Sequence, residues 1–142
     1  MPIRTAKAEW EGTMQEGNGT MHLGIGDYPY SFKTRMDEKD LAHANPEELI
    51  AAAQAGCYSM ALSARLNSHG FTPEKIETDC KVTLSMSGVG LKISRIMIIT
   101  RAKVEGMDEA SFKEHAAIAK DNCPVSMALA AVPIDLNAAL ME

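Results

Sequence analysis

Asn45-Pro-Glu-Glu-Leu-Ile-Ala-Ala-Ala-Gln-Ala-Gly-Cys57-Tyr-Ser-Met-Ala-Leu-Ser-Ala64 is the stretch of sequence on which the fold depends. Asn45 can cap a helix, and proline suits the first helical position, so the pattern predicts a helix that begins at Pro46. Gly70 is a natural stop. Between these signals the residues are apolar or small on nearly every side from Leu49 onward. This composition predicts a long central helix that is buried within protein.

Alternating apolar and polar residues predict strands on both sides of this helix. The expected strands cover residues 6–10, 20–23, 28–35, 80–86, 91–104 and 132–136, with a hairpin turn at Gly17-Asn18-Gly19. The apolar parity changes within 91–104, which predicts a β-bulge near Arg95. Two shorter helices are expected, one from an Asp108 cap to about Lys120 and one over 124–130 with Cys123 as N-cap. Antiparallel strands separated by helices indicate an α+β fold.

Length and charge exclude several classes of protein. The chain of 142 residues fits a single domain, 1–142. Lys+Arg 14 against Asp+Glu 19 give a net charge of -5 without a basic cluster, which argues against nucleic-acid binding. The first residues lack the apolar core of a signal peptide, and no uncharged run reaches the ~20 residues of a membrane span. We therefore expect a cytoplasmic protein that does not enter membranes. The four histidines lack ligand spacing, which argues against a zinc site.

The uncharged central helix also predicts a partner chain. A monomer of 142 residues can hardly surround such a helix completely. Its many alanines, with Gly56 and Ser59, would allow another helix or a sheet to approach closely. A second copy of the same chain is the simplest partner that could bury the rest of this helix, so we expect a homodimer.

Three cysteines, Cys57, Cys80 and Cys123, form neither a CxxC motif nor an even-numbered disulfide framework, which fits free or transiently oxidised thiols. A thiol becomes a useful nucleophile when a helix N-terminus or a nearby cation lowers its pKa. Cys123 is expected at a helix N-terminus. Cys57 lies about three turns inside its helix, where burial raises a thiol pKa. Its activating cation must therefore come from elsewhere in the fold, and four arginines are candidates: Arg4, Arg35, Arg95 and Arg101.

Several ordered motifs resemble the OsmC/Ohr family, the osmotically inducible and organic-hydroperoxide-resistance proteins. They are Asn45-Pro-Glu-Glu-Leu-Ile50, Ala52-Ala53, Cys57-Tyr-Ser-Met-Ala-Leu62, Gly70-Phe-Thr-Pro73 and Cys123-Pro-Val-Ser126. The resemblance runs over essentially the whole chain and is closer to the OsmC branch. It implies an intertwined α+β homodimer that reduces organic hydroperoxides, and hydrogen peroxide less well, with two cysteines and without metal, haem or another cofactor. A thiol or a dithiol such as a dihydrolipoyl group would reset the enzyme.

Carried onto this sequence, the resemblance assigns roles to four residues. Cys57 is the peroxidatic thiol and Cys123 the resolving thiol. Arg35 is the activating cation, and Glu47 is the carboxylate that orients Arg35. Cys80 matches no family motif, and its place on the apolar face of a strand indicates packing.

Helix geometry restricts how these residues can meet. Ten residues separate Glu47 from Cys57, which is about 15 Å along one straight helix, so the two side chains cannot touch directly. Three routes stay open: Arg35 lies alongside the helix, the helix bends near Gly56, or one member comes from the other subunit. Apolar residues near the pocket would favour alkyl hydroperoxides, with Met60, Phe32 and Tyr28 as candidates.

Two other functions fit the same thiols. A cysteine hydrolase or acyl-transfer enzyme would use Cys57 with a histidine, either His43 or His115, and would not need Cys123. A noncatalytic dimeric protein that binds small apolar molecules would merely line its cavity with Cys57. Replacing Cys123 by serine separates these functions, because only a two-cysteine peroxidase stalls after one oxidation.

Overall fold

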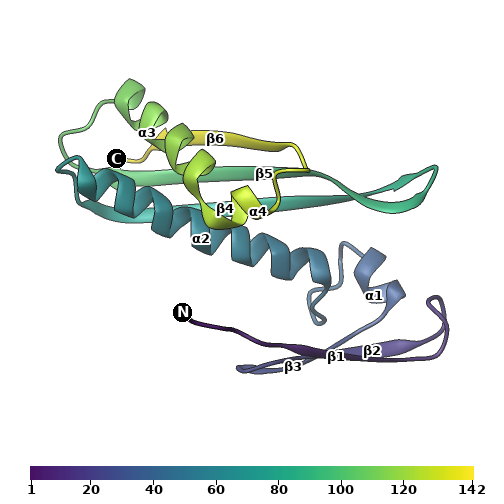
Figure 1. Ribbon diagram of the computed structural model, residues 1–142. Coiled ribbons are helices and arrows are strands. Elements are labelled where there is room, and N and C mark those ends of the chain that lie inside the picture. The colour runs from purple at the N-terminus through teal and green to yellow at the C-terminus, as the bar shows by residue number, and fades with distance from the viewer. The chain divides into compact units, whose positions relative to one another are not determined.

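The structure is a computed structural model that describes residues 1–142. It contains two compact units, Met1–Leu49 and Ile50–Glu142. No helix combines the length and the apolar character needed to span a bilayer. The elements follow in this order: β1 (Lys7–Glu11), β2 (Asn18–Leu23), β3 (Gly26–Tyr30), α1 (Phe32–Met36), α2 (Pro46–Ser68), β4 (Pro73–Ser87), β5 (Gly90–Val104), α3 (Glu109–Asn122), α4 (Pro124–Ala128) and β6 (Ile134–Leu140) (Figure 1).

The first unit contains an antiparallel sheet of order β1-β2-β3. The predicted position of its first turn is wrong, because Asn18 already pairs with Glu11 inside the sheet. The chain reverses earlier. Gly12 adopts a φ of 90° there, and the N–H of Gly17 donates to the carbonyl of Thr13 at 2.7 Å.

The predicted strand over 28–35 is confirmed only as far as Tyr30, where β3 ends and the chain continues into the short helix α1. A capping box starts this helix. The Ser31 hydroxyl accepts from the N–H of Thr34 at 3.1 Å, and the Thr34 hydroxyl oxygen accepts from the N–H of Ser31 at 2.9 Å. Arg35 therefore lies on a helix rather than at a strand end.

Helix α2 begins and ends as predicted. The Asn45 side chain accepts from the N–H of Glu48 at 2.8 Å, and Gly70 adopts a φ of 84° after the last turn. One stripe at i, i+4 spacing is fully buried: Gln54, Tyr58, Leu62 and Leu66. Residues on the opposite side, such as Gly56 and Met60, are exposed in the single chain. Burial of the whole helix by a second chain stays a prediction.

The second unit contains a sheet of order β4-β5-β6. The predicted β-bulge is confirmed, because Thr83 pairs with Arg95 while the next residue, Leu84, pairs with Ile93. The expectation of purely antiparallel sheets is wrong, since β6 runs parallel to β5. The physical reason is the connection: α3 and α4 form a helical crossover between these strands, and such a crossover returns the chain in the same direction.

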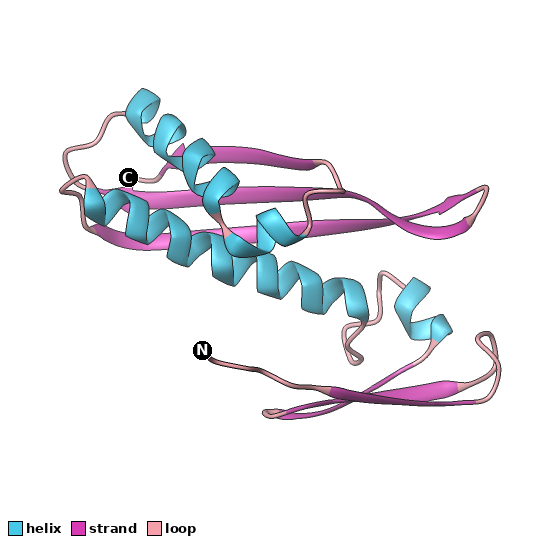
Figure 2. Ribbon diagram, viewed as in Figure 1, coloured by secondary structure: helices cyan, strands magenta, loops and turns pink.

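The helices of this unit cover one face of its sheet (Figure 2). Alternate residues of β5, Ile98, Ala102 and Val104, contribute buried side chains to the core, together with Leu62 of α2 and Phe112 of α3. The predicted Asp108 cap of α3 is confirmed, because its carboxylate accepts from the N–H of Ser111 at 2.8 Å. Cys123 is the N-cap of α4, as predicted, although α4 ends earlier than expected.

Candidate active site

Two of the three thiols lie together in the second unit. Cys57 is half-buried on α2, whereas Cys123 at the start of α4 is fully buried, and both are free. Their side chains are close enough for each thiol to shift the pKa of the other. A helix position and a helix cap that are far apart in sequence are thus neighbours in space.

Hydrogen-bond donors surround the sulfur of Cys123. The Gln54 Nε2 atom lies 3.7 Å from Cys123 Sγ and donates to Ser126 Oγ at 2.8 Å. The side chain of Ser126 and the backbone N–H groups of Ser126 and Val125 also bond to this sulfur. Burial opposes the ionisation of Cys123, but these donors outweigh it and hold its pKa below the ordinary thiol value.

The environment of Cys57 has the opposite effect. Burial raises the pKa of Cys57, and the N–H of Val125 lowers it. Cys123 raises it further, because its sulfur accepts a hydrogen bond from the neutral Cys57 thiol and its negative charge disfavours a second one on Cys57. Of the two thiols, Cys123 is therefore the one that ionises more readily. Cys57 needs an additional cation to become a nucleophile at neutral pH.

Gln54 and Ser126 are polar residues of this site to which sequence analysis assigned no role. Both are buried. A signal for Gln54 existed, because it is the one amide side chain in a run of apolar and small residues and lies three positions before Cys57. Ser126 belongs to the Cys123-Pro-Val-Ser126 motif but has no distinguishing feature in sequence.

The predicted partnership of Arg35 and Glu47 is present in the first unit. The Nε of Arg35 donates to Glu47 Oε2 at 3.0 Å, and its Nη2 donates to Oε1 at 2.5 Å. The hydrogen bond to Glu47 raises the already high pKa of Arg35, so the guanidinium is permanently charged. The exposed fractions are 28% for the Arg35 side chain and 10% for that of Glu47. The bidentate contact fixes the orientation of the guanidinium.

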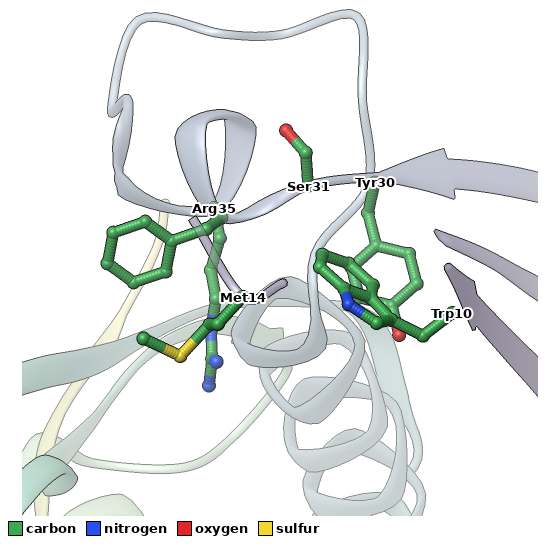
Figure 3. A pocket seen from close by; sticks show the side chains of 6 residues that line it. Trp10, Met14, Tyr30, Ser31 and Arg35 are labelled. Carbon is green, nitrogen blue, oxygen red and sulfur yellow. The ribbon is translucent and has the colours of Figure 1, made fainter. Parts of the chain in front are cut away.

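Arg35 also lines a hollow of about 190 Å³ in the first unit (Figure 3). Its other walls are mostly apolar or aromatic: Trp10, Met14, Tyr30, Ser31 and Phe32. The centroids of the Trp10 and Tyr30 rings are 5.5 Å apart. Both rings flank Gly19, where an added Cβ would lie 2.7 Å from the indole, so only glycine allows them this close. Phe32 is a predicted pocket residue that does line this hollow, whereas Tyr28 and Met60 do not.

Two of the four candidate arginines are engaged in surface ion pairs, in addition to Arg35 with Glu47. Arg95 pairs with Asp135 at 2.7 Å, and Arg101 pairs with Glu77 at 3.1 Å. All four of these side chains are at least two-fifths exposed. Such pairs are typical of a solvated sheet face.

The remaining sequence candidates have bonds to other groups. His43 bonds to Asp40 at 2.9 Å, and Nδ1 of His115 accepts from Nε of Arg65 at 3.0 Å. Burial raises the pKa of Cys80 to about 11, so this thiol is protonated at neutral pH.

Comparisons with known proteins agree with each other. The family described as OsmC-like protein matches residues 37–137. The "Peroxiredoxin OsmC" of Escherichia coli strain K12 is 41% identical over 132 residues, which cover 90% of each chain, and that of Shigella flexneri matches equally. An organic hydroperoxide resistance protein from Elizabethkingia anophelis superposes with a TM-score of 0.77 at 19% identity and covers 99% of each chain. OhrB of Bacillus subtilis superposes with a TM-score of 0.69 at 24% identity, covering 96% of this chain and 98% of its own.

Proposed function

Because this chain belongs to the OsmC-like protein family, we propose that it is a thiol-dependent peroxidase that reduces organic hydroperoxides. The observation that carries the proposal is the pair of neighbouring thiols, Cys57 and Cys123, held inside one unit. The peroxiredoxins to which the chain is similar support a peroxidase-type function. The assignment of each residue to a step is our inference.

The first step oxidises Cys57. Its thiolate attacks one oxygen of the hydroperoxide, the O–O bond breaks, and the leaving alkoxide takes a proton and departs as an alcohol. Cys57 is left as a sulfenic acid. Arg35 from the same or the partner subunit supplies the cation that favours the Cys57 thiolate, and Glu47 holds the guanidinium in one orientation.

The second step uses Cys123. Its thiolate attacks the sulfenic sulfur of Cys57, hydroxide leaves and is protonated to water, and a disulfide forms. The donors around Cys123 support this role, because they favour its thiolate and lower its pKa. A dithiol, for example of the dihydrolipoyl type, then returns both cysteines to the reduced state.

The preference for organic substrates is inferred from the hollow that Arg35 lines. Trp10, Tyr30 and Phe32 form apolar walls beside the guanidinium. An alkyl hydroperoxide can place its oxygens near the cation and its hydrocarbon against the rings, whereas hydrogen peroxide has no apolar part to bury.

We further propose that the active form is an intertwined homodimer, that residues 1–142 form one domain of it, and that it acts in the cytoplasm. The exposed small-residue face of α2 supports a dimer, because residues such as Gly56 and Ala64 would allow a second chain to approach closely. Light scattering after size-exclusion chromatography measures the mass directly. A monomer at micromolar concentration would contradict this part of the proposal.

The first experiment mixes reduced protein with one equivalent of cumene hydroperoxide, or of hydrogen peroxide in a parallel sample, and maps oxidised peptides by mass spectrometry. We expect a Cys57–Cys123 disulfide that forms faster with the organic peroxide. The Cys123→Ser variant should stop at a sulfenic acid on Cys57, which dimedone traps. Full peroxide consumption by Cys57→Ser would refute the assignment of the peroxidatic thiol, and slow, scattered oxidation would refute the peroxidase.

A further inference from the structure

Gln54 is buried in a way that packing alone does not explain. Its side chain is fully buried in a helix whose other buried residues include Tyr58, Leu62 and Leu66. One amide atom, Nε2, bonds to Cys123 Sγ and Ser126 Oγ, while the carbonyl oxygen Oε1 is buried without a partner. A buried amide that lacks one of its hydrogen bonds costs stability. Native proteins retain such groups mainly where a site needs them.

The donors of this site are distributed unequally between the two sulfurs. Cys123 receives Gln54 Nε2, the side chain and N–H of Ser126, and the N–H of Val125. Cys57 receives the N–H of Val125 alone from this set. Cys123 is also fully buried, whereas Cys57 is half-buried. The Cys123 sulfur therefore has the environment that stabilises a negative charge. The Cys57 sulfur is the one that a molecule from solvent can reach.

The difference in donors and burial between Cys57 and Cys123 determines which sulfur an external thiol attacks when it reduces their disulfide. In thiol–disulfide exchange the external thiolate attacks an accessible sulfur, and the sulfur whose thiolate is more stable leaves faster. Both conditions select Cys57 as the attacked atom and Cys123 as the leaving group. With both cysteines free, the Cys123 sulfur is already in contact with the Gln54 amide.

We infer that Gln54, together with Ser126, stabilises Cys123 as the leaving thiolate, so that the reducing dithiol attacks the Cys57–Cys123 disulfide at Cys57. This inference rests on the proposed peroxidase function and concerns its reductive half. It makes Gln54 a hydrogen-bond donor to a reacting sulfur.

Reduction of the disulfide by a dithiol takes two successive exchange steps. A thiolate of the dithiol attacks Cys57 Sγ, the Cys57–Cys123 bond breaks, and Cys123 leaves as a thiolate. The second thiol of the reductant then attacks the mixed disulfide on its own side, which releases Cys57 and closes the cyclic disulfide of the reductant. Two electrons pass to the cysteines, and the two protons lost by the dithiol end on Cys57 and Cys123.

The test begins with protein oxidised by one equivalent of cumene hydroperoxide. The oxidised protein receives 2-mercaptoethanol, which cannot close a ring and so leaves a mixed disulfide. After a brief reaction, excess N-ethylmaleimide blocks the released protein thiol and the remaining reductant. Acid quenching and peptide mapping then locate both labels. We expect the mercaptoethanol adduct on Cys57 and the maleimide on Cys123. An adduct on Cys123 overturns the inference without any variant being made.

A second measurement tests Gln54 itself. Gln54→Met keeps the length of the side chain but removes the donor, and we expect its disulfide to be opened by dithiothreitol about tenfold more slowly, the effect of losing one hydrogen bond to a charged group. Ser59→Ala is the matched control, because Ser59 on the same helix bonds to Ala55 and Thr78 rather than to a cysteine.

The outcomes distinguish the role of Gln54 from the proposed peroxidase function. Opening of the Gln54→Met disulfide at the wild-type rate, or equal slowing in Ser59→Ala, overturns the role of Gln54. Ultraviolet titration of thiolate absorbance in the Cys57→Ser background adds a readout that a structural role would not move, because loss of the donor should raise the pKa of Cys123. Failure of the wild-type protein to form a Cys57–Cys123 disulfide with peroxide refutes the proposed function instead.

Discussion

The Arg35–Glu47 pair allows a quantitative test of the proposed activation of Cys57. Glu47→Gln keeps the size of the side chain and removes its charge. The guanidinium then loses a bidentate partner to which it donates from Nε at 3.0 Å and from Nη2 at 2.5 Å. A hydrogen bond between charged groups contributes about 1.5–3 kcal/mol. Since the Arg35 side chain is 28% exposed, water compensates part of the loss, and we take about 1.5 kcal/mol as the net effect.

The same free energy applies to turnover if the pair orients the guanidinium toward the reacting thiol. A loss of about 1.4 kcal/mol lowers a rate tenfold, so kcat/KM for cumene hydroperoxide should fall by about one order of magnitude in Glu47→Gln. Arg35→Lys should be impaired at least as strongly, because an ammonium cannot form the bidentate contact. The assay is peroxide consumption with dithiothreitol as reductant, alongside urea unfolding of each variant.

Glu48→Gln is the matched control for this experiment. Glu48 occupies the same first turn of α2, is exposed and forms no ion pair, so its loss removes only the helix-dipole contribution of about 0.3–1 kcal/mol. We expect its kcat/KM to equal that of the wild type. A Glu47→Gln variant with wild-type kcat/KM would refute the orienting role of Glu47. A Glu47→Gln variant no less stable than Glu48→Gln would refute the strength assigned to the ion pair.

Three further outcomes are expected. Cys80→Ser should leave peroxide turnover unchanged, because burial holds the pKa of this thiol at about 11 and no role is assigned to it; a large loss of kcat/KM would show otherwise. Tyr58→Phe should lower the free energy of unfolding by about 1–2 kcal/mol in urea titrations, since the buried hydroxyl donates to the carbonyl of Ala116 at 3.0 Å, and an unchanged midpoint would contradict this contact. The hydrogen bond to Asp27 raises the pKa of His22, so the stabilising effect of His22 should be fully present below about pH 6.5 and should disappear as the pH rises through the raised value. Thermal unfolding of wild type and His22→Gln at pH 5.5 and pH 9 measures it, and a difference that grows with pH would reverse the sign we assign.

Local hydrogen bonds explain which elements could be predicted from sequence. The start of α2 depends on Asn45 and Pro46, and the start of α3 depends on Asp108, all of which act on backbone groups within three residues. The bulge near Arg95 was visible because a strand shows the change of face directly in its apolar parity. Each of these signals lies within a few residues, so the helix starts and the bulge can be predicted without the rest of the chain.

The first unit shows where local signals competed. Residues 28–35 alternate like a strand, yet the Ser31–Thr34 capping box turns the second half into α1. Asn18 and Gly19 have turn propensity, but pairing with β1 and the close approach of the Trp10 and Tyr30 rings place them in a strand. In the first place one local signal outweighed another, and in the second tertiary contacts outweighed turn propensity.

The candidate site also combines residues that could be predicted from sequence with contacts that only the folded chain creates. The roles of the two cysteines, Arg35 and Glu47 were implied by the resemblance to the OsmC/Ohr family, whereas chemical reasoning alone left four arginines as candidates for the cation. Only the folded structure brings Gln54 of α2 to Cys123 and Ser126 of α4, and only it leaves Cys57 half-buried while Cys123 is fully buried. Sequence specifies which atoms are available and how the nearby backbone folds. Val125 and Ser126 are local donors to Cys123, but the burial of both thiols and the donor from Gln54 depend on residues far apart in the chain. Tertiary packing therefore determines how far the two thiols differ.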